Sequence, residues 1–267
     1  MKLSLAGWSL HRLFRAAERP LVLVDFPRFT RETFGIDAVE LNSPFFESRE
    51  PQYLRKLADA ARGAGVKLLN IAVDEAGDLA SELESARLDG INNYARWIPV
   101  AKEIGCAAIR ANSGGKQVTD RAIAVANCVE SFHRLIDEGQ RHGVAVLIEN
   151  HGGISADADT IVHLMNELAK AHPPESFGTM PDFGNWPEDV DRYESLRKIM
   201  PFAKAVHAKV RDIDEQLNHP QFDHARCIKI AREAGYDGYL GIEYEGAGEP
   251  IEGIKRAVRK LTPLLRT

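Results

Sequence analysis

The segment VAVLIEN, residues 144–150, is an apolar run that ends on Glu149 and an asparagine. Three later segments repeat this pattern, because FGTMPD ends at Asp182, AKAVH ends at His207 and YLGIEYE carries Glu243. The four residues are separated by 33, 25 and 36 positions, each about the length of one strand–helix unit. If the four strands lie side by side in a parallel barrel, their ends meet at one rim. The pattern then predicts three carboxylates and an imidazole in one place, an oxygen-rich set that suits Mn²⁺, Mg²⁺ or Co²⁺.

The composition sets limits on the fold and on the partners. The chain has 267 residues, 44% of them hydrophobic, which is near the usual size of one (β/α)₈ barrel. The net charge is −5, which gives no footprint for nucleic acid, and no apolar run has membrane-spanning length. The three cysteines are far apart in the sequence, as expected for reduced thiols in the cytosol. We expect a soluble cytoplasmic protein without nucleic-acid or membrane partners, and a homo-oligomer is compatible with the sequence.

Strand-like and helix-like segments alternate along the whole chain. We expect strands at 2–8, 36–42, 66–73, 106–112, 144–150, 177–182, 203–208 and 239–244. Amphipathic helical patterns cover 51–63, 86–104, 120–142, 156–171, 187–200, 222–234 and 250–265, and 10–33 is expected to be an irregular loop. This alternation predicts a parallel sheet, and eight strands favour closure into a (β/α)₈ TIM barrel forming a single domain over residues 1–267. No G-x-G-x-x-G motif follows the first strand, which argues against a dinucleotide-binding fold.

Four motifs carry a resemblance to a known family. The motifs are VLIENHGG (146–153), PDFGNW (181–186), VHAKVRD (206–212) and YLGIEYEG (239–246). They resemble the xylose isomerase-like superfamily, and more narrowly its sugar phosphate isomerase/epimerase branch. The resemblance implies a (β/α)₈ barrel that holds one divalent metal ion (Mn²⁺, Mg²⁺, Co²⁺ or Zn²⁺) through Glu149, Asp182, His207 and Glu243. It also implies that Glu149 and Glu243 move the proton of the reaction.

These residues predict proton transfer next to a carbonyl group. A divalent ion can stabilise the enediolate left by proton loss, and a carboxylate beside that carbon is the general base. We therefore expect a metal-dependent isomerase or epimerase acting on a small carbohydrate: a sugar, keto-sugar or sugar phosphate. Loss of a hydroxyl from the same intermediate would make the enzyme a lyase or dehydratase acting on a keto-sugar or keto-inositol.

Two further alternatives are an endonuclease IV-like nuclease and a non-catalytic sugar-binding barrel. The nuclease site gathers three zinc ions with additional histidines, and the second and third strand ends have no histidine. A binding barrel would not require two opposed glutamates among the ligands.

Three candidate substrate-binding residues lie close to the predicted ligands in sequence or at the rim. His151 follows Glu149 by two positions and either contacts the substrate or packs locally. Asn185 stands where many relatives carry a histidine, and its amide can still contact a sugar hydroxyl. Trp8 either forms a wall of the sugar pocket or packs at the end of the first strand.

Two basic candidates follow His207. Lys209 is two positions later, so a strand would aim both side chains the same way. This lysine either polarises the substrate or pairs with a ligand carboxylate. Arg211 either contacts a substrate anion or pairs with Asp212 or Asp214.

Other polar features of the rim receive structural roles. We expect Glu40 to be the partner of a rim cation such as Arg110. Glycine-rich turns at Gly114–Gly115, Gly152–Gly153 and Gly246–Gly248 could bind phosphate through backbone N–H groups, although loop flexibility is the preferred explanation.

Overall fold

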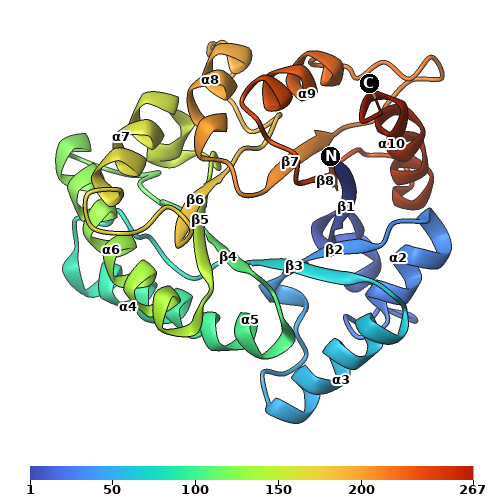
Figure 1. Ribbon diagram of the computed structural model, residues 1–267, viewed down its shortest axis with the longest axis horizontal. Coiled ribbons are helices and arrows are strands. Elements are labelled where there is room, and N and C mark those ends of the chain that lie inside the picture. Colours follow the sequence, from blue (N-terminus) through green and yellow to red (C-terminus); the bar gives the residue numbers. More distant parts are fainter. Residues whose placement is uncertain (267) are drawn as a thin grey trace.

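The computed structural model describes residues 1–266, in which eight parallel strands are surrounded by helices (Figure 1). The strands are β1 Lys2–Ala6, β2 Ala38–Asn42, β3 Lys67–Ala72, β4 Ala108–Ala111, β5 Ala145–Glu149, β6 Phe177–Met180, β7 Val206–Val210 and β8 Tyr239–Tyr244. Hydrogen-bonded neighbours follow the order β6-β5-β4-β3-β2-β1-β8-β7. Each predicted strand is present within a few residues of its expected bounds, so the predicted (β/α)₈ barrel is confirmed.

The barrel closes between β6 and β7, and we call this place the joint. Two isolated bridges connect the strands there, one pairing Thr179 with Ala203 and the other pairing Asp182 with His207. Two backbone hydrogen bonds of His207, of 2.9 and 3.0 Å, reinforce the second bridge. Two of the four predicted metal ligands therefore face each other across the joint.

The helices form the outer layer of the molecule (Figure 1). The longer ones are α2 Phe26–Phe34, α3 Pro51–Gly63, α4 Glu84–Ala95, α5 Ile98–Ile104, α6 Arg121–His142, α7 Ala158–Leu168, α8 Arg192–Ile199, α9 His224–Glu233 and α10 Pro250–Leu264. Short helical turns are α1 His11–Phe14 and the 3₁₀ segments Gly7–Leu10, Ser43–Phe45, Gly153–Ala156 and Met200–Phe202.

Aspartate residues set the start of four successive helices, α6 to α9. In each case the side chain accepts backbone N–H groups of the first turn, which have no partner inside a helix. These N-cap residues are Asp120, Asp157, Asp191 and Asp223. Because each cap fixes where a helix begins, it also limits the length of the loop between that helix and the preceding strand.

Two predictions about helices are wrong. The single helix expected over 86–104 is divided into α4 and α5, because Pro99 lies in the first turn of α5 and proline has no N–H to continue a helix. The loop expected over 10–33 contains α1 and most of α2. The start of α2 is marked by Pro27, and its end by Gly35, whose φ is 70°. Both are standard helix-boundary signals that could have been recognised.

The three cysteines are buried and free, in agreement with the predicted reduced thiols. No helix within residues 1–266 combines the length and the apolar character needed to cross a membrane. The main hydrophobic core includes residues from the strands and from the helices around them, as in other barrels of this architecture.

Candidate active site

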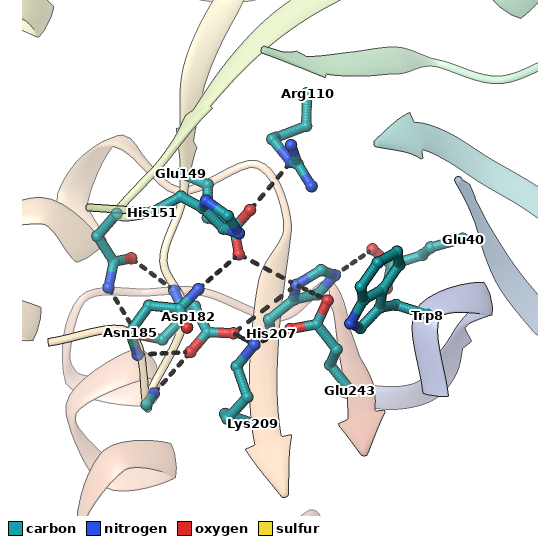
Figure 2. Close-up of polar contacts among 12 residues, drawn as sticks. Trp8, Glu40, Arg110, Glu149, His151, Asp182, Asn185, His207, Lys209 and Glu243 are labelled. Carbon is teal, nitrogen blue, oxygen red and sulfur yellow. Dashed lines mark hydrogen bonds and ion pairs between the residues drawn. The ribbon is translucent and has the colours of Figure 1, made fainter. Parts of the chain in front are cut away.

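The strand ends gather the predicted functional side chains at one rim (Figure 2). Successive residues of a strand face opposite sides, so residues two positions apart share a face. On β7, His207 and Lys209 therefore point the same way, as their spacing predicts. Glu149 is the last residue of β5, Asp182 follows β6, and Glu243 lies near the end of β8. Active sites of (β/α)₈ barrels lie at this C-terminal end of the strands.

The four predicted metal ligands form one compact group. Glu149, Asp182, His207 and Glu243 are buried, and each offers one ligand atom within 4.8 Å of the others. The Nδ1 atom of His207 is 3.5 Å from Glu149 Oε1, 3.9 Å from Asp182 Oδ2 and 3.8 Å from Glu243 Oε1. Among the described residues, Asp182 Oδ2 and His207 Nδ1 have no hydrogen-bond partner although both are buried. A cation between these atoms would satisfy them, so the group fits a divalent metal ion.

Two buried cations pair with the Oε2 atoms of the two glutamates. Glu149 Oε2 is 2.9 Å from Arg110 Nε, and Glu243 Oε2 pairs with Lys209 Nζ. The other oxygen of each glutamate faces His207, as the distances above show. Each carboxylate is therefore held through its Oε2 atom by a buried cation, which limits its rotation.

Lys209 and Arg211 contact carboxylates of the protein. Lys209 Nζ is 3.5 Å from Asp182 Oδ2 and 3.2 Å from Glu245 Oε1. This result agrees with the alternative that Lys209 pairs with a ligand carboxylate, and its predicted substrate contact stays a prediction. Arg211 pairs with Glu245 at 3.2 Å, so the alternative of a pairing with Asp212 or Asp214 is wrong, and its predicted contact with a substrate anion stays a prediction. The reason is that the end of β8 places Glu245 beside Arg211.

Burial and neighbouring charges shift the pKa values of the three carboxylates in this group. Burial raises the pKa of Asp182 to about 7, against the influence of Lys209 and with a further contribution from Glu243. Burial also acts to raise the pKa of Glu149 and Glu243. Nearby cations, mainly Arg110 and Lys209 respectively, outweigh it and hold each pKa below its ordinary value. Both glutamates are therefore ionised at neutral pH, as a general base requires.

The expected pairing of Glu40 with Arg110 is also wrong. Glu40 Oε2 instead accepts hydrogen bonds from His207 Nε2 at 3.0 Å and from Asn70 Nδ2 at 2.9 Å. Its Oε1 accepts a hydrogen bond from Ser4 Oγ at 2.7 Å. Figure 2 shows the reason, because Glu40 lies on the side of the imidazole ring away from Glu149, whereas Arg110 lies on the Glu149 side.

A cavity of about 540 Å³ opens onto this group. Trp8 and His151, two of the predicted substrate-binding residues, line it together with Glu243. The Asn185 side chain is used differently, since its amide donates to Glu149 Oε1 at 3.2 Å. Asn185 therefore helps to orient Glu149, and its predicted substrate contact stays a prediction.

Several residues that line the cavity received no site role from sequence reasoning, namely Asn42, Asp74, Asp78, Tyr94 and Lys116. Asn42 ends β2 and Asp74 follows β3, so both had the strand-end signal that identified the ligands. Tyr94 comes from α4, and Lys116 from the loop after β4. Strand periodicity says nothing about residues in those positions.

Two of the glycine-rich turns bind carboxylates of the chain itself. The backbone N–H of Gly115 donates to Asp78 Oδ1 at 2.9 Å. The N–H groups of Ala247 and Gly248 donate to Asp212 at 2.8 and 3.2 Å. These N–H groups can bind an anion, as the phosphate alternative requires, but they are already satisfied by aspartate.

Comparison with known proteins places these features in a family. The human protein named "Putative hydroxypyruvate isomerase" is 24% identical over 251 residues, which cover 82% of this chain and 83% of that protein. The C-glycoside deglycosidase alpha subunit of Arthrobacter globiformis is 40% identical over 70 residues. That likeness is local, because it covers 24% of this chain and 20% of the subunit.

A solved structure of L-ribulose 3-epimerase has a TM-score of 0.79 and 14% identity, covering 99% of this chain and 94% of the epimerase. At this identity the likeness shows the fold alone. The family model described as "Xylose isomerase-like TIM barrel" matches residues 29–264. With the barrel described above and this match over most of its length, the chain belongs to the xylose isomerase-like TIM barrel family.

Proposed function

We propose that this protein is a divalent-metal-dependent isomerase or epimerase that moves a proton next to the carbonyl group of a small carbohydrate. The observation that carries the proposal is the pair of ionised glutamates, Glu149 and Glu243, which reach the same Nδ1 atom of His207. The names of the isomerase and epimerase relatives support an enzyme of this kind.

The metal ion would be held by Glu149, Asp182, His207 and Glu243. Three carboxylates and one imidazole suit Mn²⁺, Mg²⁺ or Co²⁺, and Zn²⁺ also accepts these ligand types. When bound, the ion would supply a Lewis acid for the carbonyl oxygen of the substrate.

The two glutamates would transfer the proton. They belong to β5 and β8, which are not neighbours in the sheet, so they reach the site from different strands of the barrel. One carboxylate can remove a proton while the other returns a proton to the opposite face, which inverts the carbon. If one carboxylate moves the proton between two adjacent carbons of the substrate, the product is the isomerised sugar. Arg110 and Lys209 keep the two bases oriented during either reaction.

The charges around the cavity favour an uncharged substrate over a sugar phosphate. Arg110 is neutralised by Glu149 and by Asp74, each at 2.9 Å, which leaves Lys116 as the exposed cation of the lining. The acidic residues of the lining are Asp74, Glu75, Asp78 and Glu243. The two carboxylate-filled turns described above offer no free anion site.

A lyase is the second candidate function. The local likeness to the deglycosidase alpha subunit favours it, because that name describes removal of a group from a sugar derivative. The same basic carboxylates could remove the proton that starts an elimination from a keto-sugar. The nuclease alternative has less support, since residues 1–266 gather a single group of metal-binding side chains.

Deuterium exchange tests the proposal. The protein is loaded with Mn²⁺, Co²⁺, Mg²⁺ or Zn²⁺ and incubated in D₂O with ketoses, keto-inositols and their phosphates. Exchange at the carbon next to the carbonyl without loss of water is the expected result, together with about one metal ion per chain. An enone product would support the lyase, and three zinc ions per chain would support the nuclease. Sugar binding without metal and without any exchange would support the binding barrel.

A further inference from the structure

We propose that Glu40 is a positioning residue of the metal site, acting on His207. It would fix the His207 ring so that Nε2 faces Glu40 and Nδ1 faces the three carboxylates. This inference rests on the proposed function, because it concerns the same ligand group.

The first support is that the two ring nitrogens of His207 face different partners. His207 Nε2 is 3.0 Å from Glu40 Oε2, whereas Nδ1 faces Glu149, Asp182 and Glu243. A neutral imidazole has one N–H and one lone pair. If the N–H is donated to Glu40, the lone pair is left on Nδ1, where a metal ion would need it. Ligand histidines in proteins commonly donate their second nitrogen to a carboxylate in this way.

The second support is that Glu40 is itself held from three other strands. Ser4 on β1, Asn70 on β3 and His207 on β7 all donate to it, at 2.7, 2.9 and 3.0 Å. A carboxylate can only accept, and here it meets three donors. Its side chain is 3% exposed, so water cannot replace these partners freely. Ser4 and Asn70 therefore hold Glu40 independently of His207 and of a bound ion.

The third support is that β8 leaves space for the side chains of Glu40 and His207. A Cβ atom at Gly241 would lie 2.2 Å from Glu40 Oε1 and 2.9 Å from His207 Cδ2. A side chain at position 241 would therefore have to displace the Glu40 carboxylate or the His207 ring. Gly241 has an ordinary φ, so glycine is needed here for space and not for backbone conformation. The glycine on β8 thus leaves the space that the side chains of Glu40 and His207 occupy.

Three variants separate positioning from general stability. Glu40→Ala removes the acceptor of His207. Glu40→Gln keeps an acceptor oxygen for His207, and its NH₂ can face Ser4, whose hydroxyl can turn to accept. Ser131→Ala is the matched control, because Ser131 is equally buried and donates to the Leu79 carbonyl at 2.8 Å on the α6 side of the molecule.

Metal affinity is the first readout, measured by titration of Mn²⁺ or Zn²⁺ against a competing chelator with each protein folded. We expect Glu40→Ala to weaken binding by about 10–100-fold, Glu40→Gln to weaken it less, and Ser131→Ala to leave it unchanged. Wild-type affinity in Glu40→Ala, or an equal loss in Ser131→Ala, would overturn the inference.

The tautomer of His207 is the second readout, measured by NMR on ¹⁵N-histidine protein loaded with Zn²⁺. A proton on Nε2 and a metal-shifted Nδ1 are expected in the wild type and in Glu40→Gln, and a mixture of ring states in Glu40→Ala. A purely structural role would change the melting temperature but not this pattern. If the wild type binds no metal, the proposed metal site is wrong. The Nε2–H resonance of the metal-free protein then still shows whether Glu40 fixes the ring, and its absence would contradict the inference.

Discussion

Glu149 and Glu243 are held in matching ways within the group of four predicted metal ligands. Their Oε1 atoms lie 3.5 and 3.8 Å from the same Nδ1 atom of His207, and their Oε2 atoms each contact a buried cation. Neither glutamate can turn away without losing its ion pair with Arg110 or Lys209 in the interior, which is costly. The site is therefore organised before substrate binds.

Replacing either proposed base should slow proton transfer. For Glu149→Gln and Glu243→Gln we expect deuterium exchange into the substrate to fall by about 10²–10⁴-fold, because the amide cannot accept the proton. The measurement is proton NMR of the substrate in D₂O. Glu138→Gln makes the same chemical change on the surface of α6 and should exchange like the wild type. Exchange at the wild-type rate in either of the first two variants would contradict the assignment.

Removing Arg110 should destabilise the fold. Arg110→Met leaves Glu149 buried without its cation, so the free energy of unfolding should fall by about 3–5 kcal/mol. Urea denaturation of the metal-free protein measures this change. Arg141 pairs with Glu138 on an exposed helix face, so Arg141→Met should cost less than about 1 kcal/mol. Similar losses in the two variants would show that burial of the Arg110 pair has little effect.

A bound metal ion should stabilise the folded protein by mass action. At a free Mn²⁺ concentration of 100 times Kd, the gain is about 2.7 kcal/mol, visible as a higher melting temperature that a chelator reverses. Asp182→Ala and His207→Ala should lose the increase, since each removes a ligand. Asp189 is exposed and outside the group, so Asp189→Ala should keep it. An undiminished increase in Asp182→Ala would place the ion elsewhere.

The acidic lining of the cavity should discriminate against phosphate. We expect kcat/KM for a ketose phosphate to be lower than for the matching neutral ketose. It should rise with added salt, because salt screens repulsion between the phosphate and the carboxylates. The rate with the neutral ketose should hardly change. A preference for the phosphate that is lost in Lys116→Ala would show the opposite, namely that Lys116 provides an anion site.

His224 should make the protein less stable in mild acid. It is buried, its Nε2 donates to the Lys209 carbonyl at 3.0 Å, and burial lowers its pKa to about 4. The unfolded chain takes up this proton near pH 6.5, but the folded protein does not until about pH 4. The contribution of neutral His224 to the free energy of unfolding is therefore fully present above pH 6.5. It is lost as the pH decreases from 6.5 to about 4.

Replacing His224 by glutamine tests this linkage, since the amide can still donate to the carbonyl. Below pH 6 the slope of unfolding free energy against pH should decrease by up to about 1.4 kcal/mol per unit in His224→Gln. Denaturation curves at pH 7, 6 and 5 measure it. An unchanged slope would mean that other groups control acid stability.

Most of the fold and the ligand group could be predicted because both depend on local regularity. Apolar strand bodies recur at intervals of one strand–helix unit, and the residue after each body must lie at the rim. That reasoning placed Glu149, Asp182, His207 and Glu243 together without any knowledge of side-chain contacts. The spacing of Lys209 from His207 gave its direction for the same reason.

The partners of Glu40 and Arg110 could not be predicted in this way. Glu40 on β2 meets His207 on β7 across the interior, although their strands are not neighbours in the sheet. Which inward side chains meet depends on the tilt and stagger of the closed barrel, which no single strand encodes. The division of the helix at Pro99 was a different failure, since the sequence signal was present.

Two of the four predicted metal ligands, Asp182 and His207, also form one of the bridges at the joint between β6 and β7. Elsewhere a ladder of hydrogen bonds joins neighbouring strands, but here two isolated bridges close the ring. An ion bound by Asp182 and His207 would connect the ends of β6 and β7 across this joint. Loss of that ion would then weaken the connection between β6 and β7, so metal occupancy and closure of the barrel would depend on the same two residues.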